Sequence, residues 1–195
     1  DVNRGNVLEN NVIRHIGQLY WHSPGVFLWQ SGSNRVANNC FCHTPYSAIV
    51  CSGRIQWDAE GYGECSRSIR WAEVKELLGT CEPPRAWHQA WYPDWLRREP
   101  LLHSRDNRIH ANDISHVMEV MGDGNGIYVS GAGGGNVVSA NKVHDCPSDS
   151  MAEGIRCDDD QHDTLIDGNL VFHIGGMATG ITVKGINAIC NNIVA

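Results

Sequence analysis

Four aspartates and a histidine lie within ten positions in the stretch GIRCDDDQHD, residues 154–163. Carboxylates this close repel one another, so a folded chain needs a reason to keep them together. Three roles would account for them: cleavage of a bond, oxygen ligation of a cation, or a turn that faces water. The choice depends on where each side chain points, and therefore on the elements that carry the stretch.

The composition limits the class of protein. The chain has 195 residues, of which 42% are hydrophobic and 19% charged, as is typical of one globular domain spanning residues 1–195. Its net charge of -7 disfavours a nucleic-acid partner. No apolar run approaches the ~20 residues that cross a membrane. The eight cysteines include no CxxC pair, so buried thiols are favoured over a zinc site at Cys40, Cys42 and His43.

An internal repeat organises the chain. A short phrase recurs in which an apolar residue is followed about three positions later by asparagine and then by another apolar residue. These asparagines are Asn11, Asn39, Asn112, Asn141, Asn169 and Asn192, at intervals of 28, 73, 29, 28 and 23 residues. Asparagines at one fixed turn position can stack on one another and bond backbone groups in a sharp bend.

Between these phrases lie segments of alternating polarity: GVFLW, AIVCS, GIYVS, GIRCD and GITVK. Short strands with a period in the twenties fit a coil of parallel strands. The pattern resembles the right-handed parallel β-helix superfamily, which includes pectate lyases and polygalacturonases, over residues 1–53 and about 105–195. The resemblance implies an all-β solenoid, a carbohydrate substrate, and an extracellular or periplasmic location.

The interval of 73 residues indicates an insertion at 54–104. Within it, RWAEVKELLGTCEPP predicts a short helix ended by Gly79 and Pro83. Five tryptophans fall in the insertion, at 57, 71, 87, 91 and 95. We expect it to pack beside the coil, as a lid, with its tryptophans forming either a small core or a platform for sugar rings.

Strand alternation predicts which side chains face outward. Residues from adjacent repeats should stack in two outer columns, one of Ser130, Asp158 and Lys184 and the other of Tyr128, Arg156 and Thr182. The earlier strands should similarly expose Phe27 with Trp29, and Val50 with Ser52. Asp159, Asp160 and Asp163 should enter the turn that follows Asp158. His15, His43, His116 and His173 recur at one repeat position, which is more typical of turn residues than of catalysts.

A second acidic candidate, Asp123, lies in MGDGNGIYVSG, one repeat before Asp158. DGNGIY followed by GIRCDDD resembles the pattern of β-helical glycoside hydrolases, including xylosidase- and fucosidase-type families. The resemblance implies Asp123 and Asp158 as the catalytic carboxylates, with Asp159 or Asp160 as substitutes. The full set of candidates is Asp123, Asp158 and Asp159 for catalysis, and Tyr128, Arg156, Lys184, Asp160 and Trp29 for substrate binding. This chemistry needs no cofactor or metal.

Two alternatives remain open. A polysaccharide lyase would use Lys184, Arg156 or Tyr128 as base, and calcium could then bind Asp158, Asp159 and Asp160. A coil without enzymatic activity could bind carbohydrate or serve a structural role. Because the chain starts and stops inside a repeat, we expect either a fragment of a longer enzyme or self-association through uncapped strand edges.

Overall fold

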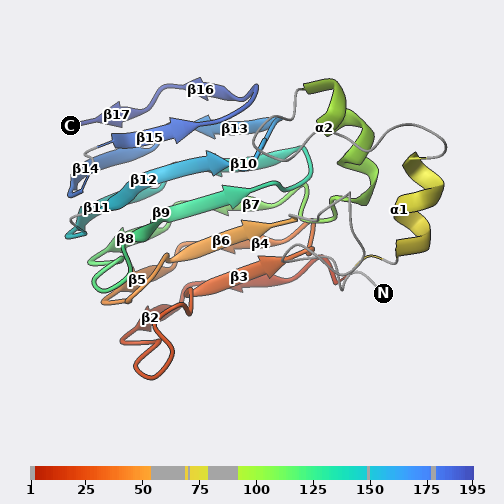
Figure 1. Cartoon of the computed structure of the whole chain (residues 1–195). Helices are drawn as coiled ribbons and strands as arrows, with labels where there is room; N and C mark the ends of the chain where they lie inside the picture. The colour runs from red at the N-terminus through yellow and green to blue at the C-terminus, as the bar shows by residue number, and fades with distance from the viewer. Residues whose placement is uncertain (1–2, 54–68, 70, 79–91, 149, 177–178) are drawn as a thin grey trace.

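The computed structural model describes residues 3–53, 69, 71–78, 92–148, 150–176 and 179–195. Almost all of its regular structure is parallel β-strand in three sheets, with little helix (Figure 1). The all-β prediction is confirmed, and the arrangement is compatible with a parallel β-helix.

The chain visits the three sheets in rotation, and we call each passage a rung. The first sheet contains β1 (Val7–Glu9), β4 (Arg35–Ala37), β7 (Arg108–His110), β10 (Asn136–Ser139), β13 (Thr164–Asp167) and β16 (Ala188–Cys190). The second contains β2 (Val12–Arg14), β5 (Cys40–Cys42), β8 (Asp113–Ser115), β11 (Lys142–Cys146), β14 (Leu170–Ile174) and β17 (Ile193–Val194). The third contains β3 (Val26–Trp29), β6 (Ile49–Ser52), β9 (Asp123–Ser130), β12 (Met151–Asp158) and β15 (Thr179–Val183).

The core lies between the sheets and is built from one inward side chain in two along each strand. Its fully buried members include Phe41, Ile49, Ile109, Ile114, Ile127, Ile155 and Ile166. Removal of this branched apolar surface from water is the main favourable contribution to folding. The inward directions predicted for Ile127, Val129, Ile155 and Cys157 are confirmed.

The predicted asparagine positions form a continuous hydrogen-bonded ladder. Asn39 Oδ1 accepts from the backbone N and the Nδ2 of Asn11, at 3.0 Å each. Asn39 Nδ2 in turn donates to Asn112 Oδ1 at 3.0 Å and to Leu8 O at 2.9 Å. The amide-to-amide bond repeats along the series, because the Nδ2 of Asn112, Asn141 and Asn169 each donates to the Oδ1 of the next asparagine, ending at Asn192. Each buried amide thereby satisfies both its donors and its acceptor inside the bend.

A second ladder lies at the other end of the first sheet. Asn6, Asn34, Asn107 and Asn136 are bonded in sequence through their Oδ1 atoms, and Asn187 accepts from Thr164 N. The sequence analysis did not use these residues, although the first letter of most repeat phrases is this asparagine.

The recurring histidines occupy turn positions, as predicted. His15, His43, His116 and His173 all have positive φ, between 50 and 54°. Asp145 takes the equivalent place in the intervening rung with φ 50°. His43 stacks on its neighbours, with ring centroids 5.0 Å from His15 and 4.9 Å from His116. The rings therefore form an ordered outer column at a bend in the coil.

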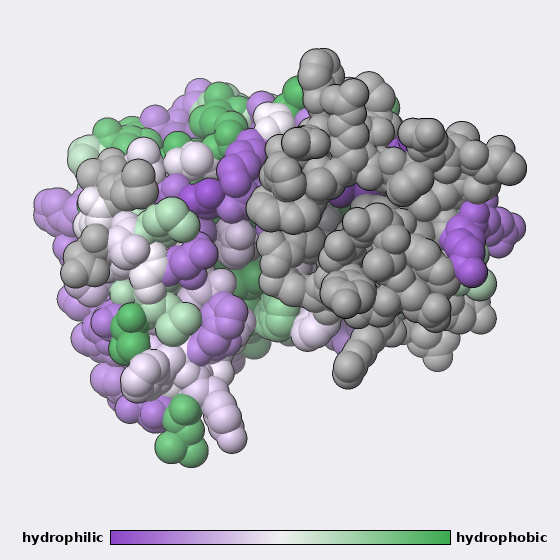
Figure 2. Space-filling model, in the orientation of Figure 1, coloured by the Kyte–Doolittle hydropathy of each residue, from purple (hydrophilic) through white to green (hydrophobic). Residues whose placement is uncertain are grey.

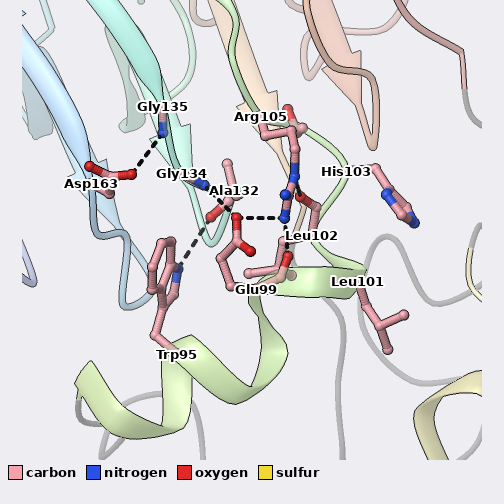
Figure 3. A network of polar contacts seen from close by, with 12 residues as sticks. Trp95, Glu99, Leu101, Leu102, His103, Arg105, Ala132, Gly134, Gly135 and Asp163 are labelled. Atoms are coloured by element: carbon pink, nitrogen blue, oxygen red, sulfur yellow. Dashed lines mark hydrogen bonds and ion pairs between the residues drawn. The ribbon is translucent and has the colours of Figure 1, made fainter. Parts of the chain in front are cut away.

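The described part of the insertion holds α1 (Trp71–Leu78), α2 (Tyr92–Arg98) and the 3-10 helix η3 (Glu99–Leu101). The predicted helix is confirmed by α1, whereas Gly79, Pro83, Trp57, Trp87 and Trp91 lie outside the described residues. Trp95 is buried, and its Nε1 donates to Ala132 O at 3.3 Å (Figure 3). This tryptophan packs against the coil instead of offering a sugar platform.

The segment around η3 is fixed to the edge of the coil by a second group of contacts (Figure 3). Glu99 Oε1 accepts from Gly134 N at 3.3 Å, and Glu99 also pairs with Arg105. Arg105 Nε donates to Leu102 O at 3.1 Å. Trp95 and Glu99 therefore contact the coil where the chain returns to the first sheet, while the role of the insertion at 54–104 as a lid stays a prediction.

We predict that Asn39→Ala lowers the free energy of unfolding by about 1–3 kcal/mol, because buried ladder donors lose their acceptor. The adjacent Asn38→Ala is the matched control. Asn38 is exposed with φ 54°, and Ala111 and Ala140 occupy the same place in other rungs with φ 53° and 52°. Asn38→Ala should therefore lower the free energy of unfolding by less than about 1 kcal/mol. Urea unfolding of both variants tests the ladder, and equal losses would contradict it.

Candidate functional site

The third sheet aligns the predicted outer residues in two columns. Strand register places Trp29, Ser52, Ser130 and Asp158 opposite one another in sequence. It places Phe27, Val50, Tyr128, Arg156 and Thr182 in the second column. Lys184 extends the first column, since its backbone N donates to Cys157 O at 2.8 Å. In the orientation of Figure 1, Figure 2 shows polar and apolar side chains intermixed over the described surface.

Glu153 joins this face through a break in the alternation of β12. A Cβ on Gly154 would lie 2.4 Å from Val171 Cγ1, so this position faces the core, as Ile155 does. Two successive inward positions turn Glu153 to the outer side, beside Arg156. Regular alternation would have placed Glu153 inside, which is why the sequence did not indicate it.

Asp158 is the centre of a polar cluster, which we define as Tyr128, Glu153, Arg156, Asp158 and Lys184. Tyr128 Oη donates to Asp158 Oδ2 at 3.2 Å. Lys184 Nζ forms an ion pair with Asp158 Oδ1, and the same oxygen accepts a hydrogen bond from Asp159 N at 2.8 Å. The side chain of Asp158 is 11% exposed and that of Lys184 50% exposed, so the cluster meets solvent on the Lys184 side.

Arg156 connects two carboxylates. Its Nη1 donates to Glu153 Oε1 at 2.7 Å, and its Nε lies 2.9 Å from Asp158 Oδ2. The contact between Nε and Asp158 is an ion pair without a hydrogen bond, because the N–H of Nε does not point at the oxygen. Since both carboxylates contact one planar guanidinium, the contacting oxygens are no more than about 8 Å apart. That upper limit admits the separation found in retaining glycosidases, ~5–5.5 Å, and the lower part of the ~6.5–9.5 Å range of inverting ones.

The surroundings of Asp158 favour its ionised form. Burial alone would raise its pKa, but hydrogen bonds from Lys184 and Asp159 N, with the charges of Arg156 and Lys184, lower the pKa below its ordinary value. Burial of Arg156 is likewise outweighed by its bond to Glu153 and by nearby negative charge, and its pKa is raised. The cluster therefore presents a fixed carboxylate anion between two cations.

Asp159 and Asp160 enter the turn after β12, as predicted, but they do not face water. Asp159 is 4% and Asp160 8% exposed, and both have positive φ, 52° and 60°. Ser130 Oγ donates to Asp159 Oδ2, and Arg98 Nη2 donates to Asp160 Oδ2. The alternative of a turn that faces water is therefore wrong for Asp159 and Asp160. Of the three turn aspartates, only Asp163 is exposed.

His162 completes the buried contacts of Asp160. Its Nδ1 accepts from Ile186 N at 2.8 Å, which leaves the ring proton on Nε2, 2.8 Å from Asp160 Oδ1. The Asp160–His162 pair resembles a catalytic dyad in composition, but both ring nitrogens are occupied and the side chains are 5% and 3% exposed. Its position suits a structural role that joins α2 to the coil.

The structure does not bring Asp123 to Asp158. Asp123 is exposed at the start of β9, seven residues before Ser130, the residue opposite Asp158. At ~3.3 Å per residue, this places the two aspartates about 23 Å apart along the sheet. Their expected pairing is therefore wrong. A repeat pattern gives the rung of a residue, but not its place along an eight-residue strand.

An aromatic pocket of about 230 Å³ lies on the same face, towards β3. It is lined by His22, Pro24, Phe27, Trp29, Tyr46, Val50, Ser52, Tyr128 and Ser130. Trp29 and Phe27 are 44% and 43% exposed, with ring centroids 5.2 Å apart. The exposure predicted for these two side chains is confirmed. The exposure predicted for Val50 and Ser52 is wrong, because these residues are only 5% and 1% exposed.

Among the described residues, no group of three or more histidines, cysteines or acidic residues is arranged to hold a metal ion. Each of the three consecutive aspartates has its own set of protein partners. No described helix is both long and apolar enough to cross a membrane. Comparisons with protein-family models, curated proteins and solved structures found no match.

We predict that Arg98→Met lowers the free energy of unfolding by about 3–5 kcal/mol, because it leaves the Asp160 carboxylate buried without a cation. Restoring neutrality with Arg98→Met/Asp160→Asn should recover part of the loss. Arg35→Met, which removes the exposed partner of Glu9, should cost at most about 1 kcal/mol. Thermal and urea unfolding compare the three variants, and a double variant no better than Arg98→Met would contradict the charge argument.

Acid stability provides a test of Asp158. Because folding lowers its pKa below the ordinary 3.8, Asp158 stabilises the fold above that pH, and its contribution is lost as pH falls through the folded-state pKa. Asp158→Asn should therefore have a shallower decline in unfolding free energy between about pH 4 and pH 2 than the wild type. Identical acid profiles would show that the aspartate is not held as an ion.

Proposed function

We propose that this chain forms a right-handed parallel β-helix of the pectate-lyase-like kind and acts as a glycoside hydrolase. The observation that carries the proposal is the pair of carboxylates on one guanidinium, Glu153 and Asp158 at Arg156, on the same face as an aromatic pocket. Glycosidic cleavage uses two carboxyl groups roughly 5–9.5 Å apart, and the upper limit of about 8 Å for this pair overlaps that range.

In this proposal Asp158 is the carboxylate that acts while ionised. Its lowered pKa suits a nucleophile or a base, and its bonds to Tyr128 and Lys184 fix its orientation. Glu153 replaces Asp123 as the second carboxyl group and is proposed as the proton donor to the leaving group. This step requires Glu153 to exchange its ion pair with Arg156 for a proton when the substrate binds. Glu153 Oε2 has no hydrogen-bond partner among the described residues and can therefore carry the proton, but it is buried, so the proposal requires substrate binding to uncover it.

The lyase alternative has less support from the geometry. Lys184 and Arg156, its two candidate cations, are both engaged by Asp158. A lyase base must instead be available to remove a proton from the substrate. Products that absorb in the ultraviolet would nevertheless identify elimination, so the assay records absorbance and reducing ends together.

The test begins with a panel of plant and algal polysaccharides, followed by aryl glycosides of the sugar that is released. We expect Asp158→Asn to lose at least about a hundredfold in kcat/KM on every substrate. Glu153→Gln should lose as much on substrates with poor leaving groups but little on activated aryl glycosides, because these need no proton donor.

Asp113→Asn is the control, because Asp113 is an exposed aspartate on the second sheet, and it should retain activity. Equal losses by Glu153→Gln on all leaving groups would make Glu153 a positioning residue for Arg156 and contradict its role as acid. Full activity of Asp158→Asn would overturn the proposed site.

A further inference from the structure

We propose that Cys40 and Cys42 form a two-coordinate site for copper(I) on the outer face of the second sheet. The site is independent of the proposed hydrolysis, because the second sheet is not the sheet that carries Glu153 and Asp158. The position of the two thiols, their exposure, and their contrast with the other described cysteines support it.

The two thiols lie on the same side of β5, in the middle of the second sheet between β2 and β8 (Figure 1). Cys40 and Cys42 are half-buried, whereas Phe41 between them is fully buried in the core. The two side chains also interact: burial and the neighbouring thiol of Cys42 raise the pKa of Cys40. Solvent therefore reaches a pair of adjacent sulfur atoms.

The thiol pair belongs to one rung only. The flanking strands present Val12 and Arg14 on β2, and Asp113 and Ser115 on β8, at the same positions. The asparagines and histidines of this coil recur from rung to rung at fixed bend positions, as residues with a structural role in a repeat do. A pair of thiols confined to one rung has no such explanation.

The other described cysteines are placed differently. Cys51, Cys146 and Cys157 are the buried thiols that the sequence favoured, and burial raises the pKa of each to about 12, so they remain neutral. Cys190 is exposed, and its Sγ donates to a neighbouring carboxylate at 3.4 Å. Among the described cysteines, the pair on β5 is therefore the one suited to bind a ligand from solvent.

Two sulfur ligands without a third select a soft ion. Thiolates prefer soft ions such as copper(I), whereas a structural zinc ion takes four ligands. The adjacent His43 is engaged elsewhere, since its Nδ1 lies 3.0 Å from Glu119 Oε1 and its ring lies against His15 and His116. Among the described residues no group of three or more ligands is arranged for a metal ion, and a two-coordinate site needs none.

The spacing of the pair fits a bridging ion better than a disulfide. A disulfide requires Cβ atoms about 3.5–4.5 Å apart, whereas alternate residues of a strand are separated by about 6.6 Å. Two metal–sulfur bonds of about 2.3 Å allow the sulfur atoms to stay up to ~4.6 Å apart. Binding forms two copper–sulfur bonds and releases the two thiol protons to solvent. Arg14, opposite Cys42, offsets the negative charge that results.

The test titrates copper(I) without oxygen against bathocuproine disulfonate, a coloured chelator whose absorbance falls as the protein takes the metal. The protein carries Cys65→Ser and Cys81→Ser, because these two cysteines lie outside the described residues. We expect one copper(I) per chain, and we expect Cys40→Ser or Cys42→Ser to lower the affinity at least about a hundredfold. Cys190→Ser is the matched control and should keep the affinity of the parent protein.

X-ray absorption at the copper edge of the loaded parent protein then counts the ligands. Two sulfur neighbours would support the site, and three or more ligands would overturn it. Serine is the natural residue at the place of Cys42 on β8, where Ser115 stands, so the serine variants should stay folded, as circular dichroism checks. Equal affinities of the Cys40→Ser, Cys42→Ser and Cys190→Ser variants, or no copper(I) retained against the chelator, would also overturn the proposal.

Discussion

A buried side-chain amide without partners costs about 1–3 kcal/mol, and this chain buries a row of them at each end of its first sheet. The rows are stable because each asparagine accepts from one rung and donates to the next. The bonds form only when neighbouring rungs are aligned to within a hydrogen-bond length. The ladders therefore fix the register of the coil, which apolar packing alone would leave free to slip.

That register determines the outer face. Once the ladders align the first and second sheets, the third sheet has little freedom, and its outer residues stack from Trp29 to Lys184. Tyr128, Asp158 and Lys184 meet although they lie far apart in the sequence. The turn after β12 then holds Asp158 in place, because Asp159 and Asp160 are bonded to Ser130 and Arg98.

Much of this could be predicted from periodicity. The ladder positions, the inward residues and both outer columns follow from a repeat with two-residue alternation. The errors arose where that regularity ends. Glu153 was missed because Gly154 breaks the alternation, and Asp123 was paired wrongly because β9 is long enough to separate its two ends. The burial of Asp160 depends on Arg98 from the insertion, a contact that no local pattern reveals.

The ladder also bears on how such a chain can change its length. Asn39 and Asn112 are 73 residues apart and bond at 3.0 Å, as do Asn141 and Asn169, which are 28 residues apart. The longer connection adds less than about 1 kcal/mol of closure entropy. The alignment of a rung is therefore set by its hydrogen bonds to the asparagines of the two neighbouring rungs, and not by the length of chain that connects them. Genetic insertions at the corner after the third sheet can accumulate at little thermodynamic cost, so new surfaces can evolve beside that sheet while the coil itself is retained.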